Sequence, residues 1–295
     1  MNISLAELED VEGIRLSAEI KPIIDTDLED EVRLCVPPKD SPNYPKFEKG
    51  IQEKIEWLRQ ELKVYGYIGY LAYDGEGKPI GFIEFMPAEG SPIPIEDVTN
   101  TALITCIYLT KTQGQGIGSR LLQATLRQLW KIGVSEVKTI VSRSPQWINS
   151  GVYRKQGFQL EKTFYRVGNP EPLDLLTYRL DGPQPKIQAV EQRIKPDLKD
   201  NLPVEVLYFH SAQCPYSSAV YINHVDALAK FSKDLVTFKT IDSWKQPELA
   251  RRCGAMFSDT FINGRCPFFA PPKQEQIENE IQKEINRVLE LRDKS

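Results

Sequence analysis

Residues 102–130 read ALITCIYLTKTQGQGIGSRLLQATLRQLW, and this stretch decides the fold. Its first part, residues 103–109, is a short apolar run bounded by polar residues, which is typical of a largely buried strand. Its last part repeats apolar residues at helical spacing from Ile117 to Leu129, which predicts an amphipathic helix. A glycine-rich loop joins the two. The stretch therefore predicts a strand, loop and helix belonging to an α/β sheet.

The loop at residues 113–118 has the composition of a phosphate-binding turn. Its glycines let successive amides turn toward one point without a Cβ in the way, and the following helix adds free N–H groups and a positive dipole end. It is not a P-loop, because Gly118 is followed by Ser119 and Arg120, and it lacks the G-x-G-x-x-G spacing of a dinucleotide-binding loop. Two interpretations remain, a pyrophosphate site and a plain glycine turn.

A family resemblance favours the pyrophosphate site. Gln113, Gly116 and Gly118 fill a Gln-x-x-Gly-x-Gly pattern that resembles the pyrophosphate loop of the GNAT superfamily, the acetyl-CoA-dependent N-acetyltransferases. A later segment, NSGVYRKQGF at 149–158, resembles the GNAT short helix that carries a Tyr before a Gly-Phe turn. The resemblance implies an α/β (α+β) fold, a GNAT mixed sheet with flanking helices, over residues 1–182, although residues 1–45 are weakly patterned.

The resemblance also implies how the co-substrate, acetyl-CoA, is held. The backbone at the end of the central strand pairs with the pantetheine arm, and the glycine loop with the helix start holds the pyrophosphate. Lys111 and Arg120 add positive charge near the phosphates. The residues implied to bind acetyl-CoA are Ile107, Tyr108, Leu109, Gln113, Gly114, Gln115, Gly116, Ile117, Gly118, Ser119 and Asn149.

Two residues are candidates for the catalytic steps. Tyr153 stands where GNAT enzymes often place a general acid beside the CoA sulfur; the alternative is a core tyrosine. Glu84 interrupts the apolar strand GFIEF and is the candidate base, with water as the other route for the proton and a plain solvated residue as the alternative. Acidic residues in and after the proline-rich loop, Glu89, Glu96 and Asp97, are candidates for binding a cationic amine or are simply solvated.

The remaining first-half elements follow from periodicity and turn residues. Apolar residues at spacings of three and four predict a helix over 46–63. Two strands joined by an Asp-Gly turn predict a hairpin, and a proline-rich loop at 87–94 follows it. The predicted strands are 67–73, 79–85, 103–109, 136–141, 158–164 and 173–179.

The C-terminal part begins after a polar segment. Residues 183–202 are predicted to be a linker or a strap across a domain surface, which divides the chain into 1–182, 183–202 and 203–295. The last part has the element order β-α-β-α-β-β-α, with a hairpin over 261–269, and resembles a thioredoxin fold. Cys214-Pro-Tyr-Ser217 resembles a glutaredoxin active-site turn whose second Cys is replaced, and the whole chain is similar to GNAT proteins with a YoaP-type C-terminal domain.

The cysteines leave alternatives open. Cys214, at a predicted helix N-terminus, is a candidate reactive thiol, but Ser217 cannot resolve a disulfide and no Pro stands at 258–260, where thioredoxin folds keep one. A structural or substrate-binding role is the alternative. Cys106 on the central strand is either packed or an acyl carrier.

Composition sets outer bounds on function. The 295 residues are 41% hydrophobic and 26% charged, and the net charge is −4. The sequence has no block of basic residues that would indicate nucleic-acid binding. No apolar run reaches the ~20 residues needed to span a membrane. An odd cysteine count without paired spacing favours the reduced cytoplasm, and no metal site is predicted. We expect an N-acetyltransferase acting on a primary amine of a small molecule or peptide; the alternative is a thiol-handling redox module whose GNAT half binds CoA.

Overall fold

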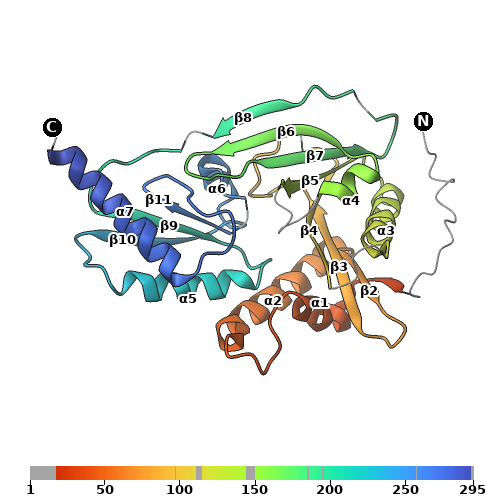
Figure 1. The fold of residues 1–295 in the computed structure, drawn as a ribbon. Helices are drawn as coiled ribbons and strands as arrows, with labels where there is room; N and C mark the ends of the chain where they lie inside the picture. Colours follow the sequence, from red (N-terminus) through yellow and green to blue (C-terminus); the bar gives the residue numbers. More distant parts are fainter. Residues whose placement is uncertain are drawn as a thin grey trace.

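The computed structural model describes residues 18–96, 98–110, 115–143, 150–184, 186–194, 196–256 and 258–293. Within them the chain forms a large sheet and a smaller one, which lie side by side with helices around them (Figure 1). The larger sheet has the strand order β1-β2-β3-β4-β5-β7-β6-β8, and the smaller has the order β10-β9-β11. The predicted fold class, a mixed α/β sheet followed by a smaller α/β unit, is confirmed.

The large unit contains the first eight strands and four α-helices. Neighbouring strands run antiparallel except for the pairs β4–β5 and β6–β8, which are parallel. No helix in the described part of the chain is long and apolar enough to cross a membrane. The elements are β1 (Glu19–Pro22), α1 (Leu28–Leu34), α2 (Glu48–Tyr65), β2 (Gly69–Tyr73), β3 (Pro79–Pro87), β4 (Thr101–Leu109), α3 (Ile117–Lys131), β5 (Glu136–Ser142), α4 (Ser150–Lys155), β6 (Gln159–Arg166), β7 (Leu173–Arg179) and β8 (Val190–Ile194).

Helices cover both faces of the large sheet. The apolar stripe of α2 packs with α1 against one face, where Phe82 of β3 is buried. The stripe of α3 packs with Tyr153 of α4 against the other face, where Ile83 is buried. Because side chains of a strand alternate between faces, Glu84 points toward the same side as Phe82, the side of α2. This alternation decides which helix Glu84 meets.

The segment predicted as a linker contains a strand of the large sheet. β8 pairs in parallel with β6, from Lys162 opposite Val190 to Arg166 opposite Ile194. Its side chains are mostly exposed, so no buried apolar face marks it in the sequence. The chain thus adds an edge strand before it enters the smaller unit.

The smaller unit has three strands and three helices in the described residues. The predicted hairpin over 261–269 is wrong in its second half: Asn263 and Gly264 turn the chain, with φ of 48° and 82°, but only a single bridge, Ile262 to Arg265, follows. The next amide, of Cys266, donates to Val167 in the large unit, which takes the chain out of the ladder. The elements are β9 (Val204–His210), α5 (Tyr216–Leu228), β10 (Val236–Asp242), α6 (Pro247–Cys253), β11 (Asp259–Ile262) and α7 (Gln274–Asp293).

Among the contacts that join the two units, one lies at α2 and another at β6. At α2, the amide of Gly50 donates to Ser218 Oγ at 3.1 Å, and a Cβ on Gly50 would lie 2.3 Å from the Pro215 carbonyl oxygen, so the backbones approach too closely for any side chain. At β6, the Arg166 guanidinium donates to Asp259 at 2.8 Å in a nearly buried ion pair. The smaller unit therefore bridges from α2 to the far half of the large sheet.

Candidate active site

The central feature of the site is a gap between two parallel strands. In the described residues, β5 pairs with Thr101–Ile104 of β4 and with none of residues 105–109. β4 continues along β3 to Leu109, and β5 continues along β7 to Ser142. The strands therefore part at Thr105. The edge of β4 beyond this point leaves backbone groups for a ligand, and it includes the predicted Ile107, Tyr108 and Leu109.

The N-terminus of α3 lies next to the end of β4. Gly116 precedes the helix with φ of 75°, a backbone conformation that favours glycine. A Cβ on Gly118 would approach the Leu109 side chain at 3.1 Å, so the small residue lets the helix start against the strand end. No acidic residue stands in the first turn, which keeps the positive end of the dipole uncompensated. The start of α3 is thus suited to an anion.

Three of the predicted ligands cannot be placed relative to this helix. Gln113, Gly114 and Asn149 lie outside the described residues, and so does Lys111. Arg120 is described, and its guanidinium donates to the Ala18 carbonyl at 2.7 Å. That contact holds Arg120 against the chain before β1.

Tyr153 is buried beside the gap. Its side chain is fully buried, and its hydroxyl lies near Thr139 and Cys106, beside the point where β4 and β5 part. Within the described part of the chain this hydroxyl makes no hydrogen bond of good geometry. Burial raises the pKa of the Tyr153 phenol, so it stays protonated at neutral pH. A buried donor without a partner is unusual and fits a group that meets a ligand.

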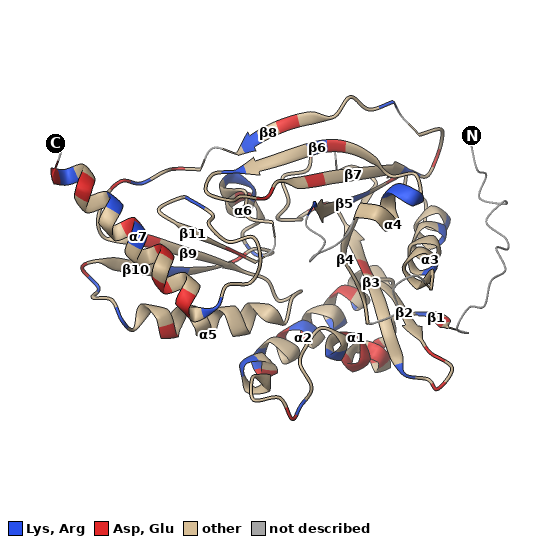
Figure 2. Ribbon diagram, viewed as in Figure 1, with Lys and Arg blue, Asp and Glu red and all other residues tan. Residues whose placement is uncertain are grey.

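A cluster of buried charges lies on the other face of the sheet. Lys54 Nζ is 2.8 Å from Glu31 Oε1 and forms a second ion pair with Glu84. All three side chains are at most 1% exposed. Figure 2 shows charged positions on α1, α2 and β3, the elements that meet here. The predicted base therefore lies in the interior and not at the surface.

The three groups fix one another's protonation. Burial raises the pKa of Glu31 well above its usual value. Burial alone would also raise the pKa of Glu84, but the charge of Lys54 and the neighbouring hydrogen bonds lower it. Burial alone would lower the pKa of Lys54, but the two carboxyl groups raise it. The directions of these shifts favour the protonated form of Glu31 and the charged forms of Glu84 and Lys54.

Gln213 connects this cluster to the smaller unit. Its amide Nε2 donates to Glu84 Oε2 at 2.9 Å, and the Thr105 hydroxyl lies 3.5 Å from the same oxygen. Gln213, Thr105 and Lys54 line an adjoining chamber, and Glu84 does not. The carboxylate of Glu84 is therefore separated from the chamber by the side chains that pair with it.

The chamber lies between the two units and has a volume of about 390 Å³. Thr105, Cys106 and Ile140 line it from the parting strands of the large sheet, and Met256 and Phe269 line it from the smaller unit. Because its wall includes the first residues beyond the β4–β5 pairing, the chamber opens onto the gap. A volume in this range is typical of a small-molecule site.

Three thiols face the chamber. Cys35, Cys106 and Cys214 come from the end of α1, from β4 and from the turn before α5. Burial raises the pKa of the Cys214 thiol, and the helix amides and Lys54 offset this only in part. Burial likewise raises the pKa of the other two thiols. At neutral pH the three are therefore neutral SH groups.

The other predicted acidic residues lie elsewhere. Glu89 lines a separate hollow of about 360 Å³ near the start of β4. The carboxylate of Glu96 is 84% exposed and pairs with Lys162 at 3.2 Å. Asp97 lies outside the described residues. Neither described residue is on the chamber wall.

The sequence contains an indication of two site residues that the sequence analysis did not select, Lys54 and Glu31. Lys54 lies on the stripe formed by Ile51, Ile55 and Leu58, where a charge interrupts an apolar face. Glu31 follows Leu28 by three positions and is buried with it. A charge on an apolar stripe indicates a buried partner, but nothing in the sequence names Gln213 as part of the same cluster.

Comparison with known proteins agrees with this geometry. Residues 30–158 match the model of the acetyltransferase (GNAT) family. The matched segment contains Lys54, Glu84, the β4–β5 gap and Tyr153. No curated protein matches the chain in sequence.

Several solved structures resemble part of the chain. An N-acetyltransferase from Staphylococcus aureus Mu50 is 18% identical, with a TM-score of 0.43, over 56% of this chain and 99% of that one. A GNAT superfamily phosphinothricin acetyltransferase from Sinorhizobium meliloti, solved with AcCoA, is 17% identical, with a TM-score of 0.43, over 58% and 96%. The ribosomal-protein-S18-alanine N-acetyltransferase from Escherichia coli is 15% identical, with a TM-score of 0.41, over 58% and 99%.

These structural likenesses are distant, and the assignment of the site rests on the chain's own residues and on the family match. That match spans the central strand, the helix that follows it and the buried tyrosine. The chain therefore carries a GNAT acetyltransferase domain within residues 30–158, and by this domain the protein is an acyltransferase.

Proposed function

We propose that the protein is an N-acetyltransferase that moves an acetyl group from acetyl-CoA directly to a primary amine. The observation that carries the proposal is the parting of β4 and β5 at Thr105, with the Tyr153 hydroxyl beside it and the chamber beyond it. Acetyl-CoA enters the gap from the side of α3, and the amine reaches the thioester from the chamber. The family match supports this division of the site.

Acetyl-CoA is bound mainly by backbone. The edge of β4 at Ile107, Tyr108 and Leu109 pairs with the amides of the pantetheine arm. The amides at the start of α3, from Gln115 through Ser119, point toward the pyrophosphate, where the helix dipole favours negative charge. Gln113, Gly114 and Asn149 complete this set in the proposal on the strength of the sequence pattern alone.

The chemistry requires one bond exchange and two proton movements. The amine nitrogen forms a bond to the acetyl carbon, the carbon–sulfur bond breaks, and CoA leaves as a thiolate. Tyr153 is the donor to that sulfur, since its phenol is protonated and lacks another good partner. The nitrogen loses one proton in exchange, and this proton finally replaces the one that Tyr153 has given up, so the protons balance.

Of the two routes for the nitrogen's proton, the geometry favours water. Glu84 is 1% exposed, is paired with Lys54 and Gln213, and has a lowered pKa, all of which weaken it as a base. We therefore assign Glu84 a positioning role: it holds Lys54 and Gln213 on the chamber wall. Cys106 is a neutral lining residue in this scheme and carries no acetyl group.

The second candidate, a thiol-handling module based on Cys214, finds little support. Ser217, in the place of a second cysteine, accepts a hydrogen bond from the Ser211 amide at 3.1 Å and contacts Ser258 Oγ at 3.1 Å. A partly buried thiol whose pKa is raised by desolvation is a poor nucleophile. We still propose that residues 203–295 have a thioredoxin-like, YoaP-like fold. The support is the strand arrangement, in which the central β9 is parallel to β10 and antiparallel to β11.

Calorimetric titration with acetyl-CoA tests the proposal. We expect one site per chain, and about tenfold weaker binding of acetyl-pantetheine, which lacks the pyrophosphate. Release of free CoA must then depend on an added amine. Absence of heat with acetyl-CoA, together with no amine-dependent CoA release, would refute the function.

A further inference from the structure

The smaller unit builds one wall of the chamber, and that wall is held in place. Gln213 is bound to Glu84 at the centre of the contact between the units, with the Gly50–Ser218 contact at one end and the Arg166–Asp259 ion pair at the other. All these contacts lie at 3.1 Å or less. The shape of the chamber is therefore as much a property of the smaller unit as of the acetyltransferase domain.

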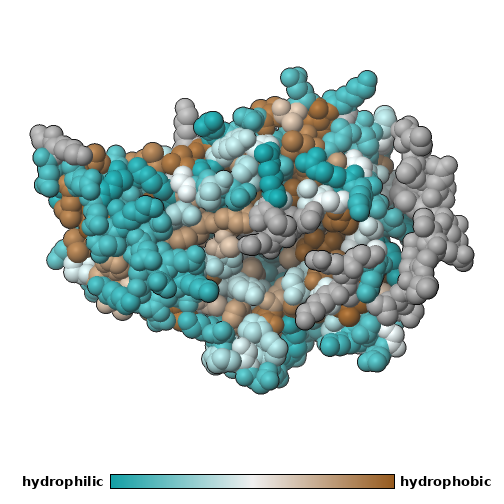
Figure 3. All heavy atoms as spheres, viewed as in Figure 1, coloured by the Kyte–Doolittle hydropathy of each residue, from teal (hydrophilic) through white to brown (hydrophobic). Residues whose placement is uncertain are grey.

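The chamber wall is predominantly apolar. Ile140, Val141 and Leu173 line it from the large sheet, and Met256 and Phe269 line it from the opposite side. Figure 3 shows apolar residues in the recess between the two units, framed by hydrophilic residues on the outer surface. Such a wall stabilises an apolar ligand body by removing its surface from water, at roughly 25 cal/mol per Å².

Charges on this wall are already paired. Among the described lining residues, the charged ones are Lys54 and Asp259. Lys54 is paired with Glu84 and contacts Glu31, and Asp259 is paired with Arg166 at 2.8 Å. Inside the chamber, a ligand with several ammonium groups would thus find no unpaired carboxylate for its extra charges, and burying an unpaired charge is costly. A ligand with one amino group does not bear this cost, because that group loses its charge before it reacts.

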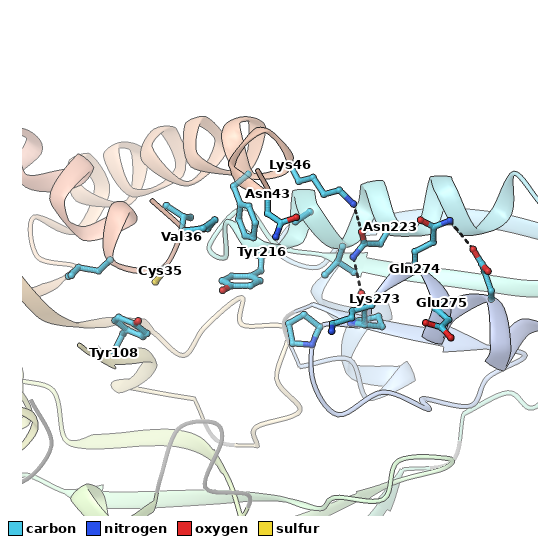
Figure 4. Close-up of a pocket in the computed structure, with 18 of the residues that line it drawn as sticks. Cys35, Val36, Asn43, Lys46, Tyr108, Tyr216, Asn223, Lys273, Gln274 and Glu275 are labelled. Atoms are coloured by element: carbon cyan, nitrogen blue, oxygen red, sulfur yellow. Dashed lines mark hydrogen bonds between the residues drawn. The ribbon is translucent and has the colours of Figure 1, made fainter. Parts of the chain in front are cut away.

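An outer groove of about 900 Å³ connects the chamber to the surface. The two hollows share Cys35, Tyr216, Pro271 and Pro272 on their walls. Figure 4 shows Tyr108 and Tyr216 near Cys35 at this junction, with the polar residues of α5 and α7 farther out. The groove gives an acceptor a path to the gap from the side away from α3.

We propose that the chamber is the acceptor site and that it selects a compact monoamine with an apolar body, in preference to polyamines. The inference rests on the proposed function and names its substrate class. The amine nitrogen lies at the end formed by Thr105 and Cys106, where the strands part, and the apolar body packs between Leu173, Met256 and Phe269. The smaller unit is thus the specificity half of the enzyme.

A competition of defined amines tests the substrate class. With saturating acetyl-CoA, CoA release is measured for 2-phenylethylamine and for spermidine. We expect kcat/KM at least about tenfold higher for 2-phenylethylamine, since the chamber discriminates by apolar contact and by an unpaired charge. Equal or higher kcat/KM for spermidine, or acetyl-CoA binding with turnover of neither amine, overturns the inference. Failure to bind acetyl-CoA would instead refute the proposed function.

Variants on the two sides of the chamber, one in each unit, test where the selection occurs. Ala270→Trp enlarges an exposed residue on the chamber wall, and Cys106→Leu fills the chamber at the gap. Each is expected to reduce kcat/KM for 2-phenylethylamine about tenfold or more while acetyl-CoA affinity changes by less than about twofold. Ala229→Trp is the matched control, because Ala229 is exposed in the same unit and lines neither hollow. Unchanged kcat/KM in both test variants overturns the inference.

Discussion

Gln213 donates a hydrogen bond of 2.9 Å to Glu84, which lies 129 positions earlier in the chain. Both side chains are buried, and the bond joins strand β3 of the acetyltransferase domain to the turn before α5 of the smaller unit. Glu84 is also the partner of Lys54, so displacement of the smaller unit would leave a buried charge pair partly unsatisfied. Residues of both units therefore belong to one buried hydrogen-bonded cluster.

Lys54→Met is predicted to destabilise the protein by about 3–5 kcal/mol, because it leaves the Glu84 carboxylate buried without its counter-charge. Chemical denaturation at pH 7 measures the loss. Lys49→Met on the same helix is the control: Lys49 is 75% exposed, and its loss should change the free energy of unfolding by no more than about 0.5 kcal/mol. Equal stability of Lys54→Met and wild type would contradict the charge cluster.

Tyr153→Phe is predicted to lower kcat about 10²-fold or more, the usual contribution of a general acid. The fold should be unaffected, since the hydroxyl that is removed makes no good hydrogen bond in the described structure. The assay is CoA release under saturating acetyl-CoA, and calorimetry checks that acetyl-CoA still binds. If the variant keeps full turnover, Tyr153 is a core residue and not the acid.

Cys214 is predicted to react slowly with iodoacetamide, because burial raises the pKa of its thiol and leaves little thiolate near neutral pH. The rate at pH 7.5 should be at least about tenfold below that of glutathione, and it should still be rising above pH 9. Peptide mapping separates Cys214 from the other thiols, and denatured protein gives the accessible reference. A rate faster than glutathione would revive the thiol-handling hypothesis.

The burial of His224 leads us to predict that the stability of the protein depends on pH. Its ring is buried between Tyr208 and Phe238, at centroid distances of 4.7 and 5.6 Å, and burial lowers its pKa to about 4. The unfolded side chain binds a proton near pH 6.5, so this stability is present above that pH and is lost as the pH falls toward 4. The loss from pH 7 to pH 5 should be about 2 kcal/mol.

The measurement for His224 is the difference between wild type and His224→Gln across this pH range, which cancels the titration of all other groups. The variant should lack the acid-side decrease of about 2 kcal/mol. Parallel stability curves for the two proteins would show that the imidazole is not held neutral by the fold.

Local pattern predicted the elements that carry strong periodicity. The buried strand at β4 and the striped helix α3 appear where the residues indicate, because each has one apolar face or run and a glycine boundary. β8 was not predicted as a strand, since an exposed edge strand carries no alternating apolar face. The prediction of a second hairpin strand was wrong because the amide of Cys266 donates to Val167 in the other unit. A local sequence pattern does not indicate a contact of this kind.

The site was predicted only in part for the same reason. Tyr153 and the start of α3 were singled out by a motif with fixed spacing, but the gap between β4 and β5 was not predicted. The partners of Glu84 come from α1, α2 and the turn before α5, and their meeting depends on how the two units pack. Long-range pairing of this kind is decided by packing and leaves only a weak trace, such as Lys54 on an apolar stripe.

The central claim is that the thioester meets the amine where β4 and β5 part, between Tyr153 and the chamber that the two units enclose. A crystal structure of the acetyl-CoA complex tests it most directly. The account predicts the pyrophosphate at the start of α3, the pantetheine arm along Ile107–Leu109, and the sulfur within hydrogen-bond reach of the Tyr153 hydroxyl. Coenzyme bound elsewhere, with the gap at Thr105 closed, would contradict it.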